Sequence, residues 1–105
     1  MYEYRAAVVR VVDGDTVRLD IDLGMDVHIY DVSCRLEGID APEAHTPEGR
    51  ASKLWLANLL RPGTEVCVKT TKADKYGRYL VKMWLGEQHV NAALVDAGHA
   101  HWKTW

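Results

Sequence analysis

The sequence predicts an α+β domain that is mainly β, in which five strands close into a barrel. One helix is expected between the third and fourth strands, and a short second helix near the C-terminus. Three strand-like segments precede the first helical segment and two follow it, so the chain lacks the regular strand–helix alternation of a doubly wound parallel sheet. Five strands with a helix after the third suit a small closed barrel of the OB type. The 105 residues fit a single domain, residues 1–105, with a small core.

The first three strands are predicted from residue type and alternation. Residues 4–12 are rich in β-branched side chains, and the Asp-Gly-Asp sequence at residues 13–15 is a tight-turn signal that ends them. Residues 16–23 alternate between apolar and polar side chains with a period of two, which is typical of a half-buried strand. After a short connection, residues 27–36 resume the strand pattern.

The first helix is predicted to begin after Thr46. Thr46 can cap the helix, Pro47 suits the first helical position, and Glu48 favours the positive end of the helix dipole. Apolar residues then recur at helical spacing until the Pro-Gly pair at residues 62–63 stops the helix. The expected buried stripe consists of Ala51, Leu54, Trp55 and Leu59, widened by Leu56 and Leu60.

The second half of the chain predicts two more strands and a short helix. Residues 64–71 and 78–85 are strand candidates, and the polar residues 72–77 connect them. Residues 90–97 form a short helical pattern that Gly98 ends. We interpret the remaining residues as a polar tail.

Composition indicates a soluble globular protein, with 48% apolar and 27% charged residues. No apolar run approaches the roughly 18 residues of a membrane span. The N-terminal residues lack the layout of a signal peptide, so we expect a cytoplasmic monomer without a membrane partner, although a leader removed before residue 1 would leave the same sequence. Two cysteines, Cys34 and Cys67, do not make a disulfide framework, and we interpret them as buried free thiols.

The charges are unevenly distributed along the chain. The net charge of −2 argues against a protein that coats DNA by bulk attraction. Residues 13–48 hold ten acids and two bases, whereas residues 61–82 hold six bases and two acids. The acidic half could bind cations and the basic segment could meet a polyanion, but solvated strand faces would give the same distribution.

Three polar clusters fall at the ends of predicted elements, where functional residues often gather. The first is at residues 13–16, the second is Arg35 with Asp40 and Glu43, and the third is at residues 74–78. Carboxylates are ligands that hard cations such as Ca²⁺ prefer, and the planar fork of arginine binds phosphate in a bidentate manner. Together the clusters predict a site that holds a metal ion beside a phosphate.

Four motifs resemble the staphylococcal nuclease (thermonuclease-like) family. They are VVDGDTV at residues 11–17, RLEGIDAPE at 35–43, DKYGR at 74–78 and VNAALVDAG at 90–98. One such motif alone is weak evidence for the family, but four in the right order over nearly the whole chain make a specific match. The resemblance implies an OB-fold barrel and a Ca²⁺-dependent phosphodiesterase that cleaves single-stranded or denatured DNA and RNA and leaves 3′-phosphate products.

The resemblance also implies a metal site. Asp15 and Asp40 correspond to the carboxylate ligands of Ca²⁺, and the backbone carbonyl of Ala41 to the third protein ligand. The two carboxylates come from different strand ends, as a site at the mouth of a barrel requires. Pro42 biases Ala41 away from helical conformations, which helps to aim its carbonyl. The role of Asp13 stays open between a place near the metal and the shaping of the turn.

Catalysis is assigned by the resemblance to Glu43, Arg35 and Arg78. Glu43 corresponds to the general base that acts on the attacking water, and the two arginines to the pair that grips the scissile phosphate. Lys75 and Tyr76 match positions that border the nucleotide. The alternatives are that Arg35 forms an ordinary surface salt bridge and that Arg78 and Lys75 are solvated loop charges.

The chain departs from the secreted staphylococcal enzyme in three places. The segment at residues 44–49 is shorter than the mobile loop of that enzyme, and Ala41 replaces a threonine. The C-terminal helix of that enzyme is missing, and its tyrosines that border the nucleotide are not reproduced. Trp102 or Trp105 is a candidate to stack on a base in their place. The lack of a leader suggests a phage-type or cytoplasmic member.

Two other classes of function stay open. A catalytically silent OB-fold module would bind nucleic acid without cleaving it, and a Ca²⁺-stabilised accessory protein would keep only the metal site. The nuclease is favoured because all the charged residues that its chemistry needs are present together, namely Asp15, Arg35, Asp40, Glu43 and Arg78.

Overall fold

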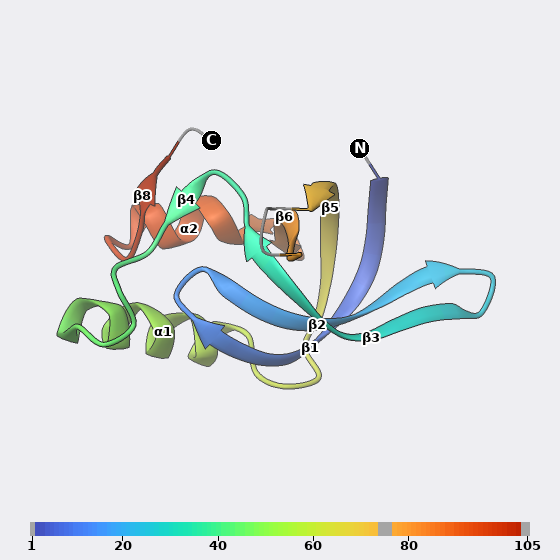
Figure 1. Ribbon diagram of the computed structural model, residues 1–105, viewed down its shortest axis with the longest axis horizontal. Helices are drawn as coiled ribbons and strands as arrows, with labels where there is room; N and C mark the ends of the chain where they lie inside the picture. The colour runs from blue at the N-terminus through green and yellow to red at the C-terminus, as the bar shows by residue number, and fades with distance from the viewer. Residues whose placement is uncertain (1, 74–76, 104–105) are drawn as a thin grey trace.

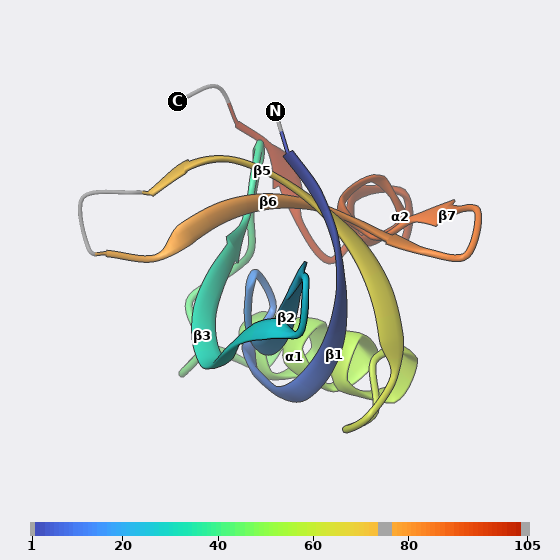
Figure 2. The same cartoon turned by 90° about the vertical axis from the view of Figure 1, so that its right-hand side faces the viewer.

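The computed structural model describes residues 2–73 and 77–103. Five strands form its centre, namely β1 (Tyr2–Asp13), β2 (Thr16–Gly24), β3 (Val27–Leu36), β5 (Glu65–Ala73) and β6 (Tyr79–Leu85). Their order is β3-β2-β1-β5-β6, and β6 returns to pair with β3 in parallel, which closes the barrel (Figure 2). The predicted fold class, a mainly β α+β protein with an OB-type barrel, is confirmed.

Two helices and three short strands complete the fold, namely α1 (Pro47–Leu59), α2 (Val90–Asp96), β4 (Ile39–Asp40), β7 (Gln88–His89) and β8 (His101–Trp102). In Figure 1, α1 lies at one end of the barrel and the β2–β3 hairpin extends from the other. β4 pairs antiparallel with β8, which brings the segment after β3 next to the last described residues. Within the described part of the chain, no helix is long and apolar enough to cross a membrane.

The order of the predicted strands and helices is confirmed, and their bounds move by only a few residues. The three short strands escaped prediction because two residues are too few to show a period of two. The polar-tail interpretation was wrong for residues 101–102, which form β8 and pair with residues 39–40.

The start of α1 agrees with its predicted cap. Pro47 occupies the first turn, and the Thr46 hydroxyl accepts a hydrogen bond from the Gly49 N–H at 3.0 Å. The same hydroxyl donates to the Glu43 carbonyl at 2.7 Å. One side chain therefore starts the helix and fixes the backbone of the loop before it.

The buried face of α1 is rotated from the predicted stripe. Leu54 is 62% exposed, and Ala51 also faces solvent. Small residues are needed on the buried face because the β1–β2 turn packs directly against the helix. A Cβ atom added to Gly14 would lie 2.1 Å from the Ser52 hydroxyl oxygen. The buried helix positions are Gly49, Ser52 and Leu56, and the stripe residues that do meet the core are Trp55, Leu56, Leu59 and Leu60.

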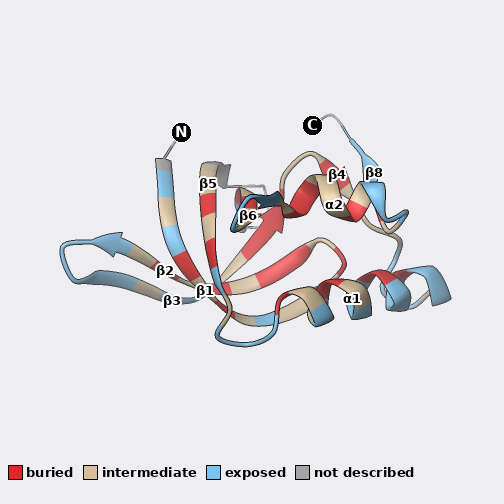
Figure 3. Ribbon diagram, turned by 180° about the vertical axis from the view of Figure 1, so that it is seen from behind, coloured by how far each residue is buried: buried red, intermediate tan, exposed pale blue. Residues whose placement is uncertain are grey.

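The hydrophobic core fills the barrel and continues under both helices, and Figure 3 shows an exposed outer face on α1, whereas α2 is mostly buried or half-buried. Cys34 is buried as predicted, whereas Cys67 is only partly buried, and both are free thiols. The largest fully buried side chains are Val17, Leu19, Ile21, Leu36, Ile39, Leu56, Leu60, Val68, Val81, Met83, Val90 and Leu94.

Asn91 is a buried polar side chain that ties α2 to the barrel. It is 1% exposed, and its carbonyl oxygen accepts a hydrogen bond from the Met83 N–H at 3.0 Å. Its amide nitrogen donates to the carbonyls of Glu37 at 2.9 Å and Val81 at 3.2 Å. Because Glu37 directly follows β3, this bridge holds the point where the chain leaves the barrel toward β4.

Candidate functional site

The β1–β2 turn presents the first candidate ligand, Asp15. The Asp13 carboxylate accepts a hydrogen bond from the Asp15 N–H at 3.2 Å, which is the local pattern of an Asx turn. Asp13 therefore shapes the turn. Gly14, in the same turn, is buried against Ser52, and this close contact packs the turn against α1.

Arg35 joins the first two polar clusters that the sequence predicted. Its side chain is 6% exposed and forms ion pairs with Asp15 at 2.7 Å and with Asp40 at 3.2 Å. The guanidinium also donates to the Ile39 carbonyl at 3.1 Å. A buried arginine needs such partners because an unpaired buried charge is costly. The end of β3, the β1–β2 turn and β4 therefore meet at one guanidinium, and the surface salt bridge considered for Arg35 is wrong.

The Asp15 carboxylate is held by several donors in a poorly solvated place. The Ala41 N–H donates to it at 2.9 Å and the Thr16 hydroxyl at 3.2 Å, in addition to the Arg35 ion pair. Burial, the largest cause, and the neighbouring Asp13 side chain raise the pKa of Asp15 from 3.8 to about 6. The Ala41 N–H and Arg35 lower that pKa, but they do not outweigh burial. A carboxylate perturbed in this way is a common mark of a functional site.

Asp40 lies at the rim of the same cluster, with its two carboxylate oxygens facing different cations. One oxygen pairs with Arg35, and the other lies 3.7 Å from the Lys103 ammonium. The backbone brings Lys103 here, because its N–H donates to the Gly38 carbonyl at 2.7 Å and β8 pairs with β4 immediately before it. Lys103 carried no sequence signal, since its place depends on a two-residue strand.

Glu43 lies on the loop after β4, with its side chain 81% exposed. The contact found for this side chain is an ion pair with His45 at 3.8 Å, in which the histidine is charged only when protonated. The Glu43 backbone is firmly placed, because a Cβ atom added to Gly49 would lie 1.9 Å from the Glu43 carbonyl. The structure thus places the loop but does not bring the Glu43 carboxylate into the cluster around Arg35.

Arg78 directly precedes β6 and lies next to the cluster. Its guanidinium donates to the Thr16 hydroxyl at 3.5 Å, and Thr16 in turn donates to Asp15. The two candidate arginines therefore approach the β1–β2 turn from neighbouring strands, since β3 and β6 are paired at this point. The other two predicted residues of this motif, Lys75 and Tyr76, lie outside the described residues.

The donor set fits a hard divalent cation in its chemistry. Asp15 and Asp40 supply carboxylate oxygens, which suit Ca²⁺ or Mg²⁺ and do not suit softer metals. Among residues 2–73 and 77–103, no group of three His, Cys, Asp or Glu side chains is arranged to hold a metal ion. Water and backbone oxygens, of which the Ala41 carbonyl is the predicted one, would have to complete the shell. The role of Ala41 stays a prediction.

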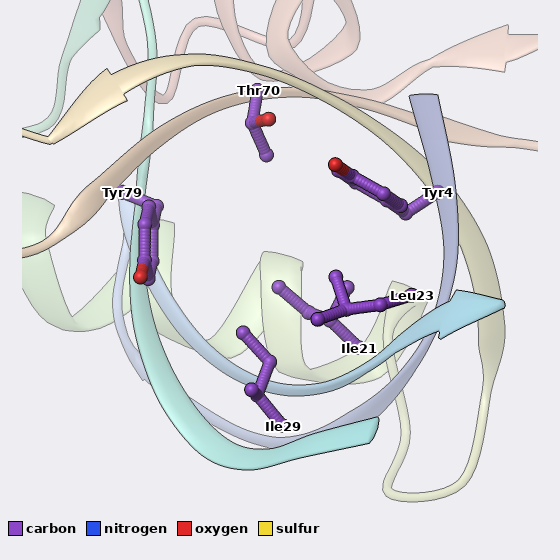
Figure 4. A pocket seen from close by; sticks show the side chains of 6 residues that line it. All are labelled: Tyr4, Ile21, Leu23, Ile29, Thr70 and Tyr79. Carbon is purple, nitrogen blue, oxygen red and sulfur yellow. The ribbon is translucent and has the colours of Figure 1, made fainter. Parts of the chain in front are cut away.

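A cavity of about 240 Å³ opens at the mouth of the barrel, apart from the charged cluster. In Figure 4 its side chains point inward from the surrounding strands, with Tyr4 and Tyr79 on opposite sides. Among the residues that the structure describes, none with a charged side chain lines this cavity, and its polar groups are the hydroxyls of Tyr4, Thr70 and Tyr79. Its lining consists of Tyr4, Ile21, Leu23, Ile29, Thr70 and Tyr79.

Comparison with known proteins finds similarity over most of the chain. The family model described as Staphylococcal nuclease homologue matches residues 33–105. The chain is 35% identical over 103 residues to the Thermonuclease of Staphylococcus intermedius, which covers 91% of this chain and 58% of that protein. It is 34% identical over 107 residues to Protein ParB of Escherichia coli, with 93% and 56% covered. It is 38% identical over 94 residues to an Uncharacterized endonuclease of Escherichia coli O157:H7, with 89% and 57% covered. The chain thus spans little more than half the length of these relatives.

Proposed function

Because this chain belongs to the staphylococcal nuclease family, we propose that it is a metal-dependent phosphodiesterase that hydrolyses DNA, RNA or both. The observation that carries the proposal is the buried Arg35 between Asp15 and Asp40. A domain that needed only stability would gain little from it, because a buried ion-pair network is often no more stabilising than apolar residues of the same volume.

Asp15 and Asp40, with the Ala41 carbonyl, hold Ca²⁺ in this proposal. When bound, Ca²⁺ supplies positive charge that stabilises the phosphoryl oxygens as their negative charge grows. Arg35 holds the two carboxylates on one side through its ion pairs, so they are placed before the ion arrives. The raised pKa of Asp15, about 6, still leaves this carboxylate mostly ionised and able to serve as a ligand at neutral pH.

Arg35 and Arg78 bind the scissile phosphate. Both guanidiniums approach the β1–β2 turn. Arginine side chains stay protonated, so both keep their positive charge throughout the reaction. The five N–H donors of an arginine allow Arg35 to keep carboxylate contacts while it donates to a phosphate oxygen. Donors already fixed where charge develops give the largest catalytic effect, because they need no rearrangement during the reaction.

Glu43 acts as the general base on the attacking water. Its exposure keeps it in contact with solvent water, and the Thr46 hydrogen bond to its carbonyl holds its backbone. A general base contributes about 10²- to 10⁴-fold to the rate, so its loss slows the reaction strongly without abolishing it. Lys75 and Tyr76 are proposed to border the nucleotide, and the products are proposed to carry 3′-phosphates.

The second candidate function is a nucleic-acid-binding module without turnover. It is favoured by one observation, which is that the Glu43 carboxylate stands outside the Arg35 cluster. Such a module would use the same basic groups to bind the backbone of a single strand.

One assay separates the two functions. The protein is incubated with denatured DNA and with RNA in Ca²⁺, then in EDTA, and the products are resolved by electrophoresis. The nuclease requires cleavage that depends on Ca²⁺ and falls about 10²-fold or more in Glu43→Gln. Glu87→Gln, at another exposed acid in the β6–β7 turn, is the matched control and should cleave normally. Tight binding without cleavage in any divalent ion would favour the binding module instead.

A further inference from the structure

Lys103 lies beside Asp40, one of the two candidate metal ligands. Its ammonium lies 3.7 Å from an Asp40 carboxylate oxygen, with Lys103 53% and Asp40 49% exposed. The contact does not arise from a freely moving side chain alone, because the Lys103 N–H is hydrogen-bonded to the Gly38 carbonyl at 2.7 Å. The β4–β8 pairing sets the register, with Asp40 opposite His101. The fold therefore delivers a lysine to the outer oxygen of a candidate metal ligand.

A divalent ion at Asp40 would compete directly with this lysine. Ca²⁺ lies about 2.3–2.6 Å from a carboxylate oxygen, so an ion on that oxygen would come close to the ammonium. Two cations that share one half-exposed carboxylate repel each other, and the monovalent one yields. The Asp40–Lys103 pair is easily exchanged, because ion pairs between solvent-exposed groups are worth only about 0.2–1 kcal/mol.

We propose that Lys103 is a substrate-binding cation that is released from Asp40 when the metal binds and then pairs with a phosphate of the nucleic acid. The inference rests on the proposed function, since it needs both a metal at Asp40 and a phosphate beside it. The four-carbon stem of lysine leaves the ammonium mobile while the backbone stays anchored to Gly38. The released ammonium then pairs with a phosphate that is held at Arg35 and the metal.

Two properties follow that a merely structural lysine would not give. Ca²⁺ alone should bind more tightly once the competing ammonium is removed, by about two- to fivefold. A single-stranded oligonucleotide should lose one phosphate contact, which lowers the slope of log K against log salt by about 0.7. A lysine that only stabilises β8 would instead weaken Ca²⁺ binding, because Asp40 would lose its placement.

The experiment measures both properties in Lys103→Ala, Lys103→Arg and Lys53→Ala. Lys53 is an exposed lysine of α1, and its replacement controls for the loss of one positive charge. Ca²⁺ binding is measured by calorimetry without nucleic acid. Oligonucleotide binding is measured in Ca²⁺ at several salt concentrations, with Glu43→Gln added to every variant so that the strand is not cleaved. Thermal unfolding of each variant shows whether the fold is kept.

The expected result is tighter Ca²⁺ binding and a smaller salt slope in Lys103→Ala, with Lys103→Arg and Lys53→Ala close to the parent in both. Unchanged or weaker Ca²⁺ binding in Lys103→Ala overturns the inference, as does an unchanged salt slope. A parent protein that binds no Ca²⁺ also overturns it, because nothing then drives the release. Failure of the proposed function appears separately, as a wild-type protein that fails to cleave DNA or RNA while these binding differences persist.

Discussion

Replacing Asn91 with alanine tests how far the candidate site depends on one buried polar bridge. The change removes the hydrogen bond from the Met83 N–H and those to the carbonyls of Glu37 and Val81. The Val81 carbonyl still accepts from the Glu37 N–H at 2.8 Å. The main loss therefore falls on the Met83 N–H, whose hydrogen bond is buried, and a smaller loss falls on the Glu37 carbonyl, whose hydrogen bond is part-buried.

The expected cost can be estimated from those two groups. A buried donor left without its partner costs about 1–3 kcal/mol and the loss of an ordinary hydrogen bond about 0.5–1.5 kcal/mol, which gives about 1.5–4.5 kcal/mol for the Met83 N–H and the Glu37 carbonyl together. Alanine is a better helix former than asparagine, which stabilises α2 by roughly 0.5 kcal/mol and offsets part of this cost. We therefore expect Asn91→Ala to lower the free energy of unfolding by about 1–4 kcal/mol. Domains of this kind typically have only about 5–15 kcal/mol, so the effect is large.

The measurement is urea-induced unfolding followed by the fluorescence of the four tryptophans. Asn91→Asp is the informative companion, because its carboxyl can still accept from the Met83 N–H but donates to the Glu37 carbonyl only when protonated. A buried carboxyl has a folded-state pKa above its unfolded value of about 3.9, so the destabilisation grows as the pH rises above that value. A loss below about 1 kcal/mol in Asn91→Ala, or a penalty in Asn91→Asp that does not change with pH, would refute the reasoning.

Three further predictions concern the site and its supports. Arg78→Lys keeps the charge but loses the planar fork, so kcat/KM for single-stranded DNA should fall at least about tenfold; near-normal turnover would contradict the bidentate role. Gly14→Ala should lower the free energy of unfolding by about 1–3 kcal/mol in urea titrations, because the new Cβ would lie 2.1 Å from the Ser52 hydroxyl oxygen and 2.8 Å from the Ala41 Cβ. Adding Ser52→Ala should recover part of that loss, and equal stability of Gly14→Ala and wild type would exclude the clash. A thiol reagent at pH 8 should label only Cys67 in the native protein, because Cys34 is 0% exposed and burial raises the pKa of its thiol to about 12. Rapid labelling of both thiols without denaturant would contradict this burial.

The fold was predictable because its main elements carry local signals. The period-two alternation of residues 16–23 marks β2, and the cap at Thr46 marks the start of α1 within one residue. The rotation of α1 was not predictable, because Leu54 and Leu56 are equally apolar. What selects the buried face is the contact of Ser52 with the β1–β2 turn, and this contact joins distant parts of the chain.

The candidate site was predictable as a set of residues but not as an arrangement. Asp15, Arg35 and Asp40 were selected from their motifs, and the structure brings them into direct contact. Sequence could not show that Arg35 is buried between two carboxylates, since a strand pattern does not say what covers its outer face. Lys103 was missed for a similar reason, because only tertiary pairing places it beside Asp40.

The pairings that complete the site also impose an order in time. Asp15, Arg35 and Asp40 are all made in the first half of the chain, yet β3 is closed by β6, and β4 is paired by β8. A nascent chain therefore carries these charged residues long before the partners that arrange them have been synthesised. The cluster can take its final form only when the segment after α2 folds back. Any chemistry that it performs is then withheld until translation of the domain is complete.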